Sequence, residues 1–167
     1  MTDQRDLDAV AAQLGRDARG VRRVAHRCPC GNPDVVETAP RLPDGTPFPT
    51  VYYLTCPRAA GAIGTLEAEG MMREMTDRLQ ADVDLRAAYQ VAHERYLAVR
   101  DAVEVVPEIA GVSAGGMPDR VKCLHVLAAH ALAAGPGENP LGDEVLERIG
   151  EWWTDGPCVE VPDASGG

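Results

Sequence analysis

Residues 50–56 read TVYYLTC, and Pro57 follows directly. β-Branched and aromatic side chains dominate this stretch, which is typical of a β-strand, whereas a proline in this position suits the first turn of a helix. The chain before Cys56 consists mainly of short apolar runs separated by turn residues, and the chain after it shows helical periodicity. Residues 56–57 therefore mark the boundary between a sheet and a helical layer, and they predict an α+β fold.

The N-terminal part is predicted to contribute one helix and two further strands. A helix over residues 3–14 precedes strands over residues 20–27 and 34–39. Prolines and glycines make residues 28–33 and 42–47 turns, because these residue types interrupt regular structure. With the strand at residues 50–56, the pattern predicts a small antiparallel sheet of about three strands.

After Pro57 the apolar residues recur at the spacing of helices. We expect helices over residues 57–69, 71–80, 82–103, 119–134 and 143–152. The segment 119–134 is apolar on most of its circumference, so we expect it to be a buried central helix on which the other layers pack. Residues 1–153 are predicted to form a single α+β domain, and residues 154–167 a disordered tail.

Composition excludes several classes of function. The chain has 167 residues with 16 basic and 26 acidic side chains, a net charge of −10, which argues against a nucleic-acid partner. No apolar run is long enough to cross a membrane, and the N-terminus is polar, so we expect a cytoplasmic protein without a membrane partner. The sequence motifs of the commonest nucleotide-binding, serine hydrolase and zinc protease classes are missing.

The five cysteines are the densest chemical signal in the sequence. Cys28 and Cys30 lie in a tight turn after a predicted strand, and Cys56 ends the strand that is expected to pair nearby. With Cys123 they would supply the four ligands of a tetrahedral zinc site or, as the alternative, of an iron–sulfur cluster. Cys158, in the predicted tail, is expected to belong to no such site.

Two alternatives for these cysteines stay open. Cys56 and Cys123 are also compatible with ordinary small buried side chains, because free cysteine is among the most buried residue types. The Cys28–Cys30 pair beside His26 and Arg27 is compatible with a reactive or redox cysteine, because neighbouring cations lower the pKa of a thiol.

A glycine-containing loop before the predicted central helix suggests an anion site. Gly115 and Gly116 would leave backbone N–H groups free at the positive end of that helix, with Arg120 and Lys122 in its first turns. His125 would lie on the side of Lys122 and complete the anion-binding set. On one straight helix Cys123 and His125 point about 200° apart, which argues against a shared metal ion.

The same loop is compatible with a plain entry into the helix, because the charge of Asp119 complements the helix dipole and repels an anion. Further arginines lie in or beside the predicted sheet and suggest a local basic face for a small anionic ligand; they are Arg22, Arg23, Arg27, Arg41 and Arg58.

Several segments resemble a known protein family. They include VAHRCPCG (24–31), PDGTPFPT (43–50) and SAGGMPDRVKCLH (113–125), and the likeness spans roughly residues 4–153. The chain is similar to the actinobacterial proteins grouped as domain of unknown function 501. This resemblance transfers no catalytic residue, but members are often encoded near a septum-formation initiator and an exopolyphosphatase, which suggests a role in cell division or phosphate metabolism.

Three hypotheses of function follow. The first is a small metal-binding domain that holds zinc through Cys28, Cys30, Cys56 and Cys123. The second is an enzyme or sensor that binds a small phosphorylated or otherwise anionic ligand through the loop at Gly115 and Gly116. The third is an adaptor with a partner among the cell-division proteins.

Overall fold

The computed structural model describes residues 2–161 and confirms the α+β class. The helices are α1 (Gln4–Leu14), α2 (Pro57–Ala68), α3 (Met71–Ala81), α4 (Val83–Val103), α5 (Leu124–Ala134) and α6 (Pro140–Ile149), and the strands are β1 (Val21–Arg27), β2 (Pro33–Thr38) and β3 (Tyr52–Leu54). A short 3₁₀ turn spans Pro107–Ile109.

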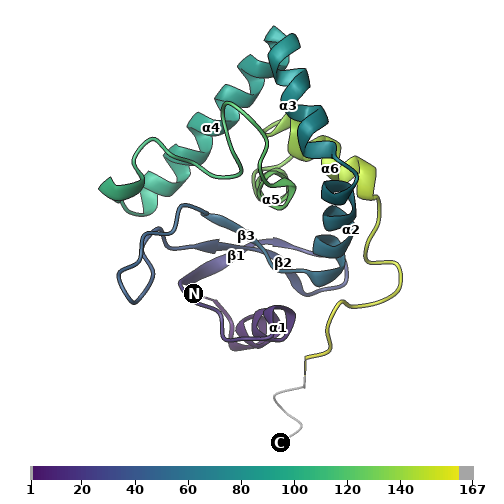
Figure 1. Ribbon diagram of the computed structural model, residues 1–167. Helices are drawn as coiled ribbons and strands as arrows, with labels where there is room; N and C mark the ends of the chain where they lie inside the picture. Colours follow the sequence, from purple (N-terminus) through teal and green to yellow (C-terminus); the bar gives the residue numbers. More distant parts are fainter. Residues whose placement is uncertain (1, 162–167) are drawn as a thin grey trace, which may run out of the picture.

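The three strands form one antiparallel sheet in the order β1-β2-β3, as the turn pattern predicts. All six residues of β2 are buried, because this central strand is covered on both faces. Figure 1 shows α1 on one side of the sheet and α5 on the other, with α2, α3, α4 and α6 arranged around α5. The sheet is thus the middle of three layers.

The predicted central helix does lie in the middle of the core. Leu124, Leu127 and Ala128 on α5 are fully buried and belong to one apolar cluster with Tyr52 of the sheet and Tyr96 of α4. The helix extends away from the viewer in Figure 1 and is surrounded by the other elements.

The predicted start of this helix at residue 119 is wrong: α5 begins at Leu124. The residues before it form a compact turn, in which the N–H of Lys122 donates to Gly115 and the N–H of Arg120 donates to Gly116. In a helix that starts at residue 119, the N–H groups of Arg120 and Lys122 would point along the helix axis and could not both make these contacts. The first N–H of α5 instead donates to Glu67 Oε2 of α2, at 2.9 Å.

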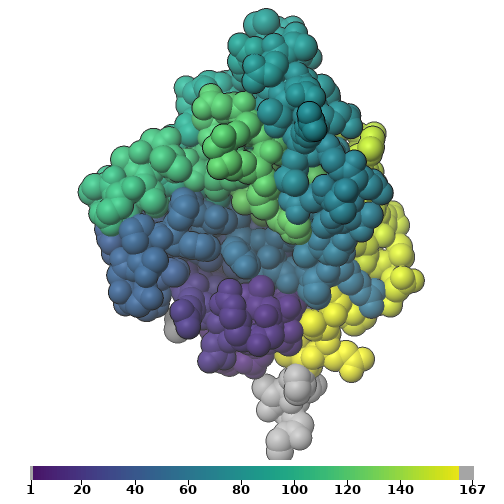
Figure 2. Space-filling view, viewed as in Figure 1, coloured from purple at the N-terminus to yellow at the C-terminus, as the bar shows by residue number. Residues whose placement is uncertain are grey.

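The C-terminal segment after α6 runs down the side of the molecule toward α1 (Figure 2). The side-chain amide of Asn32 donates to the carbonyl of Val159 at 3.1 Å, and the amide of Gln13 donates to the sulfur of Cys158 at 3.2 Å. Residues 162–167 of the predicted tail lie outside the described residues. Within residues 2–161, none of the helices is long and apolar enough to cross a membrane.

His130 of α5 makes the stability of this core depend on pH. Its side chain is 1% exposed, stacks on Tyr52 and lies 3.2 Å from the amide nitrogen of Asn139, and burial lowers its pKa to about 4. The unfolded chain binds a proton at this histidine below pH ~6.5, whereas the folded protein does so only below pH 4 or so. We therefore expect the free energy of unfolding to fall by about 3 kcal/mol as the pH drops through this window.

Urea unfolding at a series of pH values measures this effect. The matched variant His130→Gln keeps a polar group beside Asn139 but removes the titration, so its unfolding free energy should depend less on pH between 4 and 6.5. An equal pH dependence in both proteins would assign the acid sensitivity to other groups.

Candidate metal centre

Cys123 lies directly before the first turn of α5. Its backbone is extended (φ −152°, ψ 112°), so it is the N-cap residue rather than part of the helix. Burial raises the pKa of the Cys123 thiol, but a hydrogen bond with His125 and the backbone N–H of Val126 outweigh burial and bring the pKa below its ordinary value. The helix N-terminus thus favours the thiolate form of this side chain.

His125 connects α5 to α2 through both ring nitrogens. Nε2 lies 3.1 Å from the carbonyl oxygen of Ala60, and Nδ1 lies 3.3 Å from Glu67 Oε1. Because a carbonyl oxygen only accepts, Nε2 carries a proton. The hydrogen bond with Cys123 is the main cause that raises the pKa of His125 to about 9, against the opposing effect of burial and with the help of Glu67.

Glu67, in the last turn of α2, completes the group. Its Oε2 accepts the N–H of Leu124, which leaves Oε1 directed at His125. One donor atom each of Glu67, Cys123 and His125 lies within 4.8 Å of the other two, and in residues 2–161 this is the one group of three or more such side chains so close together.

A cavity of about 510 Å³ opens beside this group. Cys123 and His125 line it together with Tyr52 and Leu54 of β3 and with Pro57 and Ala60 of α2. Cys123 and His125, but not Glu67, therefore border space that a water molecule or a small ligand can enter.

The structure does not bring Cys123 to the other three predicted ligands. Cys28 and Cys30 lie in the turn after β1, and Cys56 is the N-cap residue of α2. Cys30 and Cys56 interact with Cys158, whereas Cys123 lies with Glu67 and His125. Burial, as the largest cause, raises the pKa of Cys28 to about 12 and that of Cys56 to about 11.

The predicted anion-binding residues divide between two places. Gly115, Gly116, Arg120 and Lys122 line one shallow cavity with Thr76 of α3. Because α5 begins only at Leu124, these residues are not at its N-terminus, and the argument from the helix dipole is wrong for them. His125 lies in the other place, beside Cys123. A small anionic ligand in the loop cavity stays a prediction.

The arginines of the predicted basic face largely pair with carboxylates. Arg22 and Arg23 both contact Glu37, at 2.9 and 3.0 Å, and Arg27 contacts Asp6 at 2.7 Å. Arg41 lies 2.7 Å from Glu108. Since these carboxylates neutralise the guanidinium groups, the sheet offers less positive charge to an anion than its sequence suggests.

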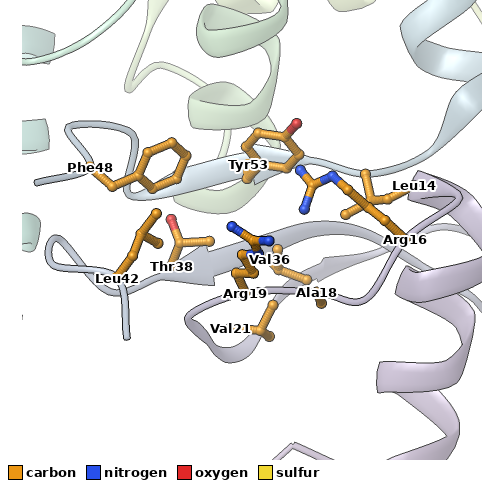
Figure 3. Close-up of a pocket in the computed structure, with 10 residues that line it drawn as sticks. All are labelled: Leu14, Arg16, Ala18, Arg19, Val21, Val36, Thr38, Leu42, Phe48 and Tyr53. Carbon is orange, nitrogen blue, oxygen red and sulfur yellow. The ribbon is translucent and has the colours of Figure 1, made fainter. Parts of the chain in front are cut away.

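A separate groove of about 300 Å³ runs beside the end of α1. Arg16 and Arg19 contribute guanidinium groups to a lining that is otherwise largely apolar, including Val36, Phe48 and Tyr53 (Figure 3). Its lining contains no cysteine, histidine or carboxylate, so it offers no metal ligand or nucleophile of the kind found beside α5.

A comparison with protein families confirms the resemblance seen in the sequence. The model of the family described as protein of unknown function DUF501 matches residues 24–147. The chain belongs to this family. No curated protein and no solved structure matches the chain. The DUF501 match contains Glu67, Cys123 and His125 but ends before Cys158.

Sequence reasoning missed the association of these three residues in the DUF501 segment. The angle of 200° between Cys123 and His125 holds only inside a helix, and it does not apply because Cys123 is the extended N-cap residue. Glu67 has no local signal, since a glutamate at the end of a helix is commonly solvated. Its role follows from a contact with Leu124, 57 positions along the chain.

Proposed function

We propose that this protein binds a zinc ion through Cys123, His125 and Glu67, with a fourth coordination position open to the adjoining cavity. One observation carries the proposal: three donor atoms lie close together, and each ligand is also held by a backbone group. The N–H of Leu124 holds Glu67, the carbonyl of Ala60 holds His125, and the N–H of Val126 holds the sulfur of Cys123. Such outer hydrogen bonds orient the ligands of metal sites.

The donor set favours zinc over an iron–sulfur cluster. Thiolate, imidazole and carboxylate together are ligands that zinc accepts in tetrahedral sites, whereas an iron–sulfur cluster generally requires four cysteines. Three protein ligands and one open position are the arrangement of catalytic rather than purely structural zinc. Bound zinc would supply a Lewis acid and a coordinated water of lowered pKa at the mouth of the cavity.

The chain's own residues have separable roles in this site. Cys123 and Glu67 carry the negative charge that offsets the cation. His125 would bind the ion through Nδ1, because its Nε2–H donates to the carbonyl of Ala60. Tyr52 and Leu54 form part of the apolar lining of the cavity. The partner predicted among cell-division proteins stays a prediction.

Elemental analysis of the purified full-length chain tests the proposal. Cys123→Ser should contain about one zinc per chain less than the unsubstituted protein, because the thiolate is lost. Glu67→Gln keeps an acceptor for the N–H of Leu124 but loses the charge, and it should weaken zinc binding at least ~10-fold in a chelator competition. Lys122→Ala, beside the site but without a ligand atom in it, is the matched control and should bind zinc normally.

Unchanged zinc content in Cys123→Ser would contradict the proposal. It would favour a second candidate function, in which Cys123 is a nucleophile. Two observations support this alternative: the residue lies at the N-terminus of α5, and its thiol contacts His125. In that case iodoacetamide should modify Cys123 faster than any other cysteine, and His125→Ala should slow this reaction.

A further inference from the structure

The groove beside the end of α1 has an apolar lining that all three strands help to form. Val21 of β1, Val36 of β2 and Tyr53 of β3 line it, and Phe48 from the loop before β3 lies beside them. The ring centroids of Phe48 and Tyr53 are 6.2 Å apart, so the two rings form one aromatic surface. Its volume of about 300 Å³ is sufficient for a small molecule.

Two arginines from the segment between α1 and β1 add positive charge to this groove. Figure 3 shows the guanidinium groups of Arg16 and Arg19 directed into it. Within residues 2–161, neither guanidinium forms an ion pair with a carboxylate, and the one hydrogen bond of Arg16 goes to the carbonyl of the adjacent Asp17 at 3.4 Å. The two charges are therefore available to an anion.

This availability contrasts with the arginines that the protein uses to pair its own acidic side chains. The chain has 26 acidic and 16 basic residues, so carboxylates are plentiful. The arginines within 4.0 Å of a carboxylate are Arg22, Arg23, Arg27, Arg41, Arg78 and Arg95. The fold thus leaves Arg16 and Arg19 without such a partner at a cavity, although the sequence offers many.

Asp44 is a carboxylate that senses the charge of Arg19 without pairing with it. Its side chain accepts the N–H of Thr46 at 2.9 Å. Hydrogen bonds from Thr46 are the main causes that lower the pKa of Asp44, and the charge of Arg19 adds a smaller effect. Because Asp44 is engaged in its own turn, it does not occupy the hydrogen-bond donors of Arg19.

We propose that this groove binds a small amphipathic anion. A carboxylate or phosphate group of the ligand pairs with Arg16 and Arg19, because guanidinium groups present parallel N–H donors to such oxygens. An apolar chain or ring of the ligand packs on Val36, Phe48 and Tyr53, where it removes apolar surface from water. Neither part alone accounts for both the charge and the lining of the groove.

The groove lies next to the candidate metal centre but does not depend on it. Leu14 and Tyr53 line both the groove and the cavity beside Cys123, so the two spaces adjoin. Cys123, His125 and Glu67 do not line the groove. The anion site therefore stands or falls separately from the proposed zinc site.

Nuclear magnetic resonance titration of the ¹⁵N-labelled full-length chain tests this proposal with four probes. Octanoate and octyl phosphate carry both an anionic group and an apolar chain, octanol lacks the charge, and inorganic phosphate lacks the chain. At least one of the first two should shift the amide signals of Val21, Val36 and Tyr53, and the tighter of them identifies the preferred anionic group. Octanol and inorganic phosphate should bind at least ~10-fold more weakly.

Substitution of the arginines separates the charge from the apolar lining. Arg16→Gln and Arg19→Gln should each weaken binding of the octyl anion at least ~5-fold and leave octanol unaffected. Both side chains are exposed, so these variants are expected to fold, and an unchanged circular dichroism spectrum verifies this. Arg73→Gln is the matched control, because Arg73 is also exposed but does not line the groove.

The variant Cys123→Ser distinguishes this site from the metal centre. It should bind the octyl anion as tightly as the unsubstituted protein does, whatever its zinc content. Three results would overturn the anion site: no shift with octanoate or octyl phosphate at millimolar concentrations, equal affinity for octanol, or binding that is lost in Cys123→Ser but kept in both arginine variants. The last result would place the anion on the metal centre instead.

Discussion

Gly142→Ala is expected to lower the free energy of unfolding by about 3 kcal/mol, although alanine stabilises most helices. A Cβ atom at residue 142 would overlap the carbonyl oxygen of Leu127 and would lie 2.9 Å from the Cβ of Ala131. The obstacle is largely the backbone of α5, which cannot rotate away as a side chain can. The helices α5 and α6 must therefore separate, and this disturbs the centre of the core.

Thermal and urea unfolding measure the effect, which corresponds to a fall of roughly 6–12 °C in the melting temperature of a chain of this size. Gly64→Ala in α2 is the matched control, because a Cβ atom there meets no atom within 4 Å. It should raise the free energy of unfolding by about 0.5–1 kcal/mol. Equal effects at residues 64 and 142 would show that α5 and α6 do not approach as closely as described.

Arg100→Met is the second substitution expected to have a large effect, a loss of about 3 kcal/mol of stability. Arg100 of α4 is 1% exposed, and its guanidinium donates to the carbonyls of Pro49 at 3.0 Å and Ile109 at 2.8 Å. Methionine fills most of the aliphatic volume but leaves the carbonyl oxygen of Pro49 without its Arg100 donor, and it leaves that of Ile109 with the N–H of Val112 alone. The loss of these two hydrogen bonds outweighs the relief from no longer burying a charge.

A matched control lies on the same helix. Arg95 is 56% exposed and pairs with Glu138 at the surface, so Arg95→Met should change the unfolding free energy by less than ~1 kcal/mol. If Arg100→Met unfolds at the same urea concentration as Arg95→Met, the two carbonyl contacts of Arg100 contribute little to stability.

Local sequence patterns are sufficient for most of the fold. The sheet follows from turn residues between short apolar runs, and the positions of α2, α3 and α4 follow from apolar periodicity and from glycine at the break between α2 and α3. The start of α5 is different, because Pro118 and Asp119 look like the beginning of a helix. Tertiary contacts override that signal: the backbone of residues 115–122 closes a turn, and Glu67 caps the helix at Leu124.

The candidate sites are less accessible to sequence reasoning than the fold. Cys123 and His125 are conspicuous in the sequence, but their relation depends on one extended residue at a helix boundary, and such boundaries are the least certain part of a sequence-based prediction. Cys158 is surrounded by polar and small residues that indicate a tail. Its neighbours in space lie more than 100 positions earlier in the chain, where no local pattern refers to it.

The place of α5 at the centre of the core has a consequence for biosynthesis. The ribosome makes the sheet and three of the surrounding helices before residue 124, the first residue of the helix on which they pack. Until α5 leaves the exit tunnel, the apolar side chains of Tyr52, Ile63 and Tyr96 lack their main packing partner. The nascent chain can therefore bury these side chains only after α5 has been synthesised, and until then its exposed apolar surface makes it prone to aggregation.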